Sequence, residues 1–191
     1  MHGLINRSLQ FFLRDTYGAA LWSSVAEQAG VPPEGFEAML TYEDALTDRL
    51  LAAAAVALSK PREALLEDLG MFLVSLEPLR RLLRFGGVDY VDFLHSLDEL
   101  PDRARLAVAD IGLPDLELTP GEDGSFRLIS GGVAPAGFLP VMAGVLRAMA
   151  DDYGAFALVD MAEGGDAVQI ELLQTEYSAG RSFDLARPEV A

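Results

Sequence analysis

The side chains that could do chemistry in this chain are few in kind. It has two histidines, His2 and His95, no cysteine, and 30 acidic residues among its 191. The lack of cysteine excludes disulfides, thiolate catalysis, cysteine-ligated zinc and iron–sulfur clusters, and it fits a reducing compartment. Two histidines far apart in sequence, without an H-E-x-x-H pattern, give no zinc site. We therefore predict no metal centre of these common kinds.

Catalytic motifs are missing as well. The sequence contains neither G-x-S-x-G nor G-x-x-x-x-G-K-[ST], and its Gly131-Gly132 pair lacks the third glycine of a dinucleotide site. Carboxylate pairs such as Asp151-Asp152 are expected in a chain this acidic, and they indicate a solvated face. We expect that the chain is not an enzyme.

The net charge of the chain limits the classes of partner that it could bind. A formal net charge of −16 repels phosphate backbones and anionic lipid surfaces, so we expect no nucleic-acid partner. No apolar run approaches the ~20 residues of a bilayer span, which predicts no membrane insertion. Because residues 1–7 lack the basic region and apolar stretch of a secretory signal, a cytoplasmic location is expected.

Helical periodicity dominates the first two-thirds of the chain. Apolar spacing and Gly/Pro punctuation predict helices over 4–16, 19–29, 34–40, 45–58, 61–76, 79–84, 88–97 and 99–109. Ser59 is expected to cap the helix that opens with Pro61, and Asp98 to cap the last of these helices.

In the last third of the chain, apolar residues recur with a different period. Alternating apolar residues over 116–130 predict a β-hairpin, and 155–162 with 167–174 predict a second one. Between them, 137–153 is a strongly apolar helix. We predict one α+β domain over 1–177, helical over about 1–112 and α/β over about 113–177, followed by a loosely ordered tail over 178–191.

Four stretches resemble one known family. They are MHGLINRSLQFFLRDTYGAALW at the start, LGMFL at 69–73, LRRLLRFGGVDYVDFLHSLDELPDRARL at 79–106 and GFLPVMAGVLRAMADDYG at 137–154. Together they are similar to the heme nitric oxide/oxygen-binding (H-NOX) domains, the sensor modules of bacterial signalling proteins and of soluble guanylate cyclase. The resemblance implies an H-NOX-like fold, in which a helical N-terminal subdomain is followed by a four-stranded antiparallel sheet with packed helices. Heme, the family cofactor, lies between the two parts.

The histidine that ligates the heme iron in the family has no counterpart in this sequence. The stretch FLHSLDEL resembles the segment immediately before the proximal histidine, and this places Pro101 at the ligand position. Proline has no lone pair to give to iron. With Asp98 as cap, Pro101 falls in the first helical turn, where its missing N–H has no intrahelical acceptor in any case. We therefore expect that the chain lacks this ligand chemistry of the family and keeps its fold.

The family's propionate-binding run, Y-x-S-x-R, is not matched either. When the run is aligned without a gap on residues 137–140, its tyrosine, serine and arginine correspond to Gly131, Val133 and Pro135. When it is shifted so that its serine matches Ser130, its tyrosine and arginine correspond to Leu128 and Gly132. An arginine fork makes bidentate carboxylate recognition strong, and nothing in 131–137 replaces it.

The resemblance leaves a candidate cleft with six lining residues: Ile5, Leu100, Pro101, Pro114, Leu146 and Met149. We expect this cleft to be collapsed or to hold another apolar or tetrapyrrole-like ligand. His95 is the alternative metal ligand, but it lies six residues before Pro101, about 240° around a helix axis and away from the expected heme side.

The predicted function is thus an H-NOX-like sensory or regulatory domain in bacterial signalling that does not bind heme in the usual histidine-ligated mode. Two alternatives stay open: a heme-binding NO/O2 sensor with an unconventional axial ligand, and a ligand-free protein-interaction module. No output domain is present in the sequence, so the partner is expected to be a separate signalling protein. In the family such partners are diguanylate cyclases, histidine kinases and chemotaxis receptors.

Overall fold

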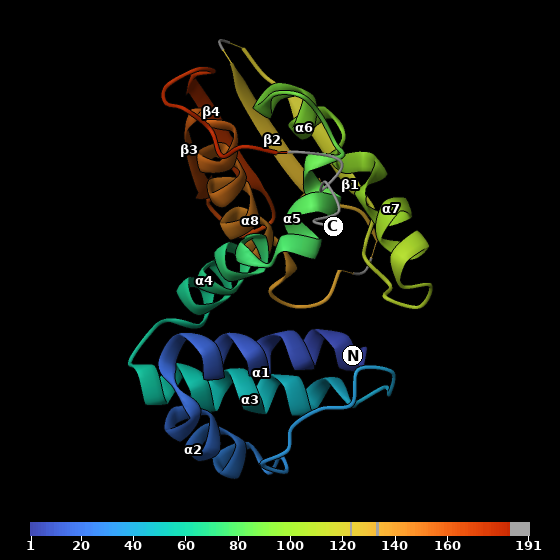
Figure 1. Cartoon of the computed structure of the whole chain (residues 1–191), viewed down its shortest axis with the longest axis vertical. Helices are drawn as coiled ribbons and strands as arrows, with labels where there is room; N and C mark the ends of the chain where they lie inside the picture. Colours follow the sequence, from blue (N-terminus) through green and yellow to red (C-terminus); the bar gives the residue numbers. More distant parts are fainter. Residues whose placement is uncertain (123, 133, 184–191) are drawn as a thin grey trace, which may run out of the picture.

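A helical layer and a sheet-containing layer follow each other along the chain and meet at two crossing helices (Figure 1). The structure is a computed structural model and describes residues 1–122, 124–132 and 134–183. Its elements are α1 (Gly3–Tyr17), α2 (Ala19–Ala29), α3 (Asp44–Leu58), α4 (Arg62–Ser75), α5 (Glu77–Arg84), α6 (Tyr90–His95), the 3-10 turn η1 (Leu97–Glu99), α7 (Leu100–Ala107), β1 (Leu116–Pro120), β2 (Ser125–Ser130), α8 (Phe138–Tyr153), β3 (Phe156–Met161) and β4 (Val168–Gln174).

The helical layer has a core of its own. The apolar stripe of α1, with Leu9, Phe12 and Leu13, packs against α2, α3 and the first turns of α4. Trp22 is buried in the same cluster, and its indole N–H donates to the Pro33 carbonyl at 3.0 Å. Burial of these large side chains, at roughly 1.5–3 kcal/mol each, holds the layer together.

The sheet has the strand order β1-β2-β4-β3 with every neighbouring pair antiparallel. Its inward positions, among them Leu128, Val159 and Ile170, pack against α8, while the alternate positions face outward. Both predicted hairpins and the predicted α+β fold with a four-stranded antiparallel sheet are confirmed.

The two layers join where α4 crosses α8. A Cβ on Gly144 would lie 2.8 Å from the carbonyl carbon of Glu67 and closer still to its oxygen, and a Cβ on Gly70 would lie 2.8 Å from the amide nitrogen of Val145. The two backbones therefore touch. Beside the crossing, the Arg147 guanidinium forms an ion pair with Glu67 at 2.5 Å. Because α4 contributes to both cores, it is the physical link between them.

The predicted helix over 34–40 is wrong. The backbone turns there instead, because Gly35 has a φ of +88° and the Gln10 side chain binds the segment at two points. Its Nε2 donates to the Glu34 carbonyl at 3.1 Å, and its Oε1 accepts from the Phe36 amide at 3.1 Å. A tertiary contact from α1 thus overrides the local signal of Pro32-Pro33.

Two predicted caps are also wrong. Ser59 has a left-handed φ of +52° and ends α3, while Pro61 is the N-cap of α4. Asp98 lies inside η1 and does not cap α7, whose N-cap is Glu99 without a side-chain hydrogen bond. The capping carboxylate of this region is Asp89, which accepts from the Asp92 amide at 2.8 Å and starts α6.

The segment after β4 has no regular secondary structure, but it is attached to the sheet layer. The Tyr177 and Ser178 amides donate to the Gly154 carbonyl at 2.8 and 3.0 Å, and the Arg181 amide donates to the Asp152 carbonyl at 2.9 Å. The remainder of the predicted tail, 184–191, lies outside the described residues. In the part of the chain that the structure describes, no helix is long and apolar enough to cross a membrane.

Candidate functional site

Pro101 lies in the first turn of α7 and is buried. This is the position that the sequence predicts, and the helix begins around it without distortion because a first-turn residue needs no intrahelical N–H bond. The neighbouring Leu100 is 6% exposed and belongs to the core under the sheet. At the position that the resemblance assigns to the iron-ligating histidine, the chain therefore has a proline ring, which cannot coordinate metal.

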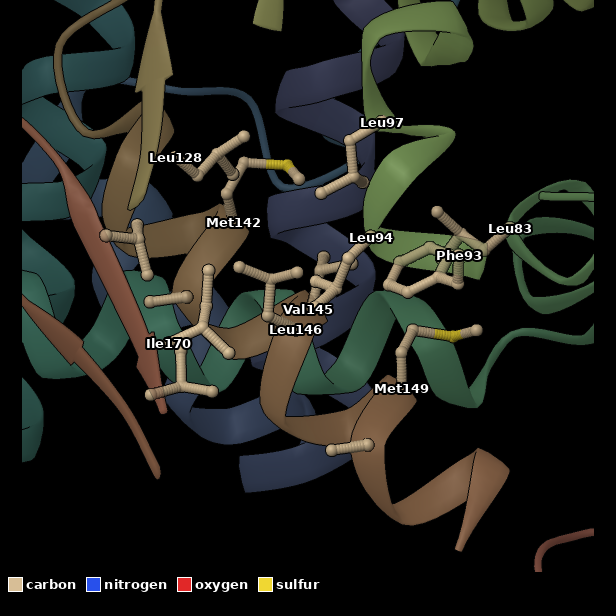
Figure 2. Close-up of a cluster of buried hydrophobic side chains, with 14 of the residues drawn as sticks. Leu83, Phe93, Leu94, Leu97, Leu128, Met142, Val145, Leu146, Met149 and Ile170 are labelled. Carbon is tan, nitrogen blue, oxygen red and sulfur yellow. The ribbon is translucent and has the colours of Figure 1, made fainter. Parts of the chain in front are cut away.

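The six candidate cleft residues fall into different surroundings. Leu100, Leu146 and Met149 belong to one core cluster, Pro114 is buried just before β1, and Ile5 is a half-buried residue of α1 in the other layer. In Figure 2 the side chain of Met142 extends between Leu97 and Leu128 within that same cluster. The fold thus brings three of the six together, and it does so among closely packed core side chains.

Two surface cavities lie beside the sheet layer. One, of about 470 Å³, lies between the starts of α4 and α8 and the β3–β4 turn, and the other, of about 520 Å³, lies on the outer face of the sheet. None of the six candidate residues lines either cavity.

The contacts of both histidines are structural ones away from the first turn of α7 in sequence. The Nδ1 atom of His2 accepts from the Leu4 amide at 3.2 Å as the N-cap of α1. His95 ends α6, is exposed, and packs edge-on against the Phe126 ring with the centroids 5.8 Å apart. Among the described residues, no group of three or more His, Asp or Glu side chains converges on a point that could hold a metal.

The stretch that the resemblance aligns with the propionate-binding run contains no cationic side chain. Leu128 points into the core with no exposed surface, and Ser130 ends β2 half-buried. The Gly131 amide donates to the Asp115 carbonyl at 2.8 Å, and Val133 lies outside the described residues. Arg127, the nearest arginine in sequence, is exposed and forms an ion pair with Asp166 at 3.2 Å. A histidine-ligated heme with clamped propionates does not fit these residues.

A buried charge cluster lies at the end of α8 instead. Asp152 is 1% exposed and accepts from Arg80 Nε at 2.6 Å, with Arg84 at 3.6 Å and Arg181 at 3.7 Å. The hydrogen bond to Asp152 is the main cause that raises the pKa of Arg80. The Ser182 carbonyl accepts from Arg80 at 2.9 Å, so the cluster also holds the segment after β4 against α5.

Two tyrosines border this cluster. The Arg84 guanidinium lies 3.9 Å from the ring centroid of Tyr153, whose hydroxyl donates to the Gly87 carbonyl at 2.9 Å. Burial raises the pKa of Tyr153 to about 12, against a smaller opposing effect of Arg84. Burial also raises the pKa of Tyr90, whose hydroxyl donates to the Leu146 carbonyl at 3.1 Å.

The sequence analysis missed this cluster because it treated Asp151 and Asp152 together as solvated. Asp151 is exposed, as predicted, but Asp152 is buried. The spacing contains the signal, since Asp152 follows Met149 by three residues and Val145 by seven, which places it on the apolar face of α8.

Comparison with known proteins gives a match to one family. The sequence model of the family described as "Haem-NO-binding" matches residues 2–158. The chain is similar to soluble guanylate cyclase gcy-31 of Caenorhabditis elegans, with 26% identity over 118 residues, and to soluble guanylate cyclase 89Db of Drosophila melanogaster, with 23% identity over 126 residues. The matched parts are 60% and 64% of this chain but only 17% and 19% of those cyclases.

Among solved structures, the fold resembles H-NOX domains. An H-NOX protein from S. oneidensis in the Fe(II) ligation state has a TM-score of 0.76 at 17% identity, covering 92% of this chain and 98% of that one. A variant of T. Tengcongensis H-NOX has a TM-score of 0.75 at 17% identity, covering 92% and 99%. At such identities the likeness describes the fold alone.

Proposed function

The chain belongs to the Haem-NO-binding family, and from this premise we propose that it is a sensory or regulatory domain in bacterial signalling that works without a histidine-ligated heme. Domains of this family are sensors rather than enzymes, which agrees with the lack of catalytic motifs in the sequence. The observation that carries the proposal is the buried Pro101 at the position of the iron ligand, on a helix that is otherwise intact.

A second observation supports the proposal independently. The run from Leu128 to Gly132 offers no arginine, so the carboxylates of a heme would lack the partner that compensates their removal from water. A domain that has lost both the iron ligand and the propionate-binding arginine but has kept the fold is expected to respond to another input. Pro101 and the other five candidate residues remain our proposed lining for such an input site.

The means of signalling that we propose is a shift between two arrangements of the layers. The glycine contact between α4 and α8 lets the two backbones slide on each other without side chains in the way, and α4 carries residues of both cores. An input can shift this equilibrium only by as much as it binds one arrangement better than the other. A ligand or partner that contacts α1 and α7 together would meet that condition.

The proposed receiver of the signal is a separate signalling enzyme or receptor. The curated relatives are soluble guanylate cyclases, in which the matched part is a small fraction of the protein. For this chain we propose a diguanylate cyclase, a histidine kinase or a chemotaxis receptor.

One alternative has an observation in its favour. Leu97, Met142 and Leu146 pack into one continuous core, and neither of the two described cavities reaches the candidate cleft residues. This packing favours a ligand-free interaction module, in which the input is a protein contact.

Thermal unfolding of the heme-free protein tests the proposal. We expect one cooperative transition without cofactor, and a melting temperature that does not change when hemin is added in several-fold excess. A ligand that binds only the folded state stabilises it by RT ln(1 + [L]/Kd), about 2.7 kcal/mol at a hundredfold excess over Kd. A melting temperature that rises steadily with hemin concentration would therefore contradict the proposal.

A further inference from the structure

Among the residues that the structure describes, the helices pack on one face of the sheet, and side chains on its other face are exposed. The inward residues Val159, Val168 and Ile170 are buried against α8, whereas the residues between them in the strands face outward. Three of these outward residues are large and apolar: Phe156 and Leu158 on β3 are 41% and 46% exposed, and Leu173 on β4 is 48% exposed. Leucine at outward positions of a solvated sheet face has no folding role that the structure reveals.

These side chains form part of a continuous apolar strip. Leu158 pairs in register with Glu171, and Leu173 lies two residues further along β4, at an irregularity where Ala157 pairs with Leu172 and Phe156 with Gln174. Leu173 is exposed on the same side as Leu158, whereas Leu172 packs against the core. Phe156 is the preceding outward residue of β3, and its ring lies 5.0 Å from that of Tyr177. We call Phe156, Leu158, Leu173 and Tyr177 the outer strip. A contiguous exposed apolar patch is the usual mark of a protein contact.

A hollow continues the outer strip across the sheet. The cavity of about 520 Å³ is lined by Leu158 and by residues of β1, β2 and β4, including Thr119, Phe126 and Arg127. The outer strip and this hollow together give an elongated apolar surface that runs over several strands.

The charges around the outer strip are mainly negative. Asp160 and Glu171 flank Leu158, Glu176 adjoins Tyr177, and all three are exposed. The one cation in the lining of the hollow, Arg127, forms an ion pair with Asp166. A second copy of a chain with net charge −16 would be repelled from this surface, whereas a basic segment would be attracted to it.

The edge of β3 is less suited to adding a strand than its face is to holding a helix. The Val159 carbonyl already accepts from Arg147 Nε at 2.8 Å and Nη2 at 2.5 Å, and Arg147 also lies 3.6 Å from Asp160. A strand added at this edge would compete with the guanidinium. A helix with apolar residues on one face and basic residues at its flanks needs no free backbone groups.

From these observations we propose that the outer strip, with the hollow beside it, is a docking surface for a basic amphipathic helix of a partner protein. This surface lies on the opposite side of the sheet from Pro101 and the core. The proposal therefore does not depend on whether heme is bound.

The test is a titration of the full chain with a labelled helical peptide of about 18 residues, five turns, with leucines along one face and lysines on the other. A peptide with glutamates in place of the lysines is the charge control. We expect the basic peptide alone to bind, with an affinity that falls as salt is added. The double variant Leu158→Thr/Leu173→Thr should bind about tenfold more weakly, which is about 1.4 kcal/mol.

Matched variants separate this surface from general attraction to an acidic protein. Threonine preserves strand propensity, and unchanged thermal unfolding of the double variant verifies that it is folded. Val56→Thr, at an exposed position of α3, should leave binding unchanged. Glu171→Gln should weaken binding, and Glu27→Gln on α2 should not.

Several results would overturn the proposal. These are no binding of the basic peptide, equal affinity of the double variant and the unaltered chain, or equal binding of both peptides. Sedimentation that detects a dimer abolished by Leu158→Thr/Leu173→Thr would assign the surface to a second copy instead.

Discussion

Replacement of Gly144 by alanine tests the joint between the two layers. Its added Cβ would lie 2.8 Å from the carbonyl carbon of Glu67, whereas carbon atoms in contact prefer about 3.5–4.0 Å. The obstacle is backbone, which cannot rotate away as a side chain can. The carbonyl oxygen of Glu67 is closer still, so the helices α4 and α8 must move apart by at least about 1 Å, which loosens the packing along the crossing.

The expected size of the effect follows from two opposing contributions. Overpacking of this kind costs about 1–3 kcal/mol, and alanine regains about 0.5–1 kcal/mol of helix propensity over glycine. Because the contact is with backbone, we expect the packing cost to lie at its upper end, which leaves Gly144→Ala destabilised by about 2 kcal/mol. For a domain of this size that lowers the melting temperature by about 4–8 °C.

Thermal and urea unfolding measure this change. Ala52→Gly, at an exposed position within α3, is the control that measures helix propensity alone. Gly70→Ala should destabilise for the same reason, and the double variant should cost less than the sum, because one separation of the helices accommodates both methyl groups. Stabilisation by Gly144→Ala, or strict additivity of the pair, would refute a close backbone contact at this crossing.

Three further predictions concern the charge cluster, the tyrosines and the proximal position. Asp152→Asn should destabilise the protein by about 3 kcal/mol or more in urea unfolding, because Arg80 keeps its charge without its buried partner. The control Asp151→Asn should change the free energy of unfolding by no more than about 0.5 kcal/mol. Burial raises the pKa of Tyr153 to about 12, so the folded chain keeps a proton that the unfolded chain loses near pH 10. The free energy of unfolding should therefore fall as the pH rises from about 10 to 12. An equally steep fall in a Tyr153→Phe variant would count against this assignment. Pro101→His should still purify without heme, because 128–132 lacks an arginine and Leu97, Met142 and Leu146 occupy the core; a strong Soret band in that variant would mean that the cleft opens and that only the iron ligand was lost.

The parts of the fold that follow from local chemistry were predictable. The glycines at 137 and 154 bound α8, and both have a left-handed φ that favours glycine. Turn residues between alternating apolar runs predicted both hairpins. The place of Pro101 in the first turn of α7 was predicted correctly, although the N-cap is Glu99 and not the expected Asp98. In each case the residues that decide the structure are adjacent in sequence.

The parts that depend on distant residues were not predictable in this way. Gln10 holds 34–36 in a turn from a position more than 20 residues away, so the local helix signal there was misleading. Asp152 is buried because Arg80, on another helix, compensates its charge. The spacing of Asp152 on α8 could have indicated burial, but nothing near it in sequence identifies its partner.

The heme content of the purified protein tests the central claim most directly. The chain is expressed with hemin supplied, purified, and its absorption compared with its protein concentration. We expect a folded, colourless protein with far less than one heme per chain, because Pro101 offers no ligand and 128–132 offers no arginine. An intense Soret band with one heme per chain would contradict this account and would support a gas sensor with an unconventional axial ligand.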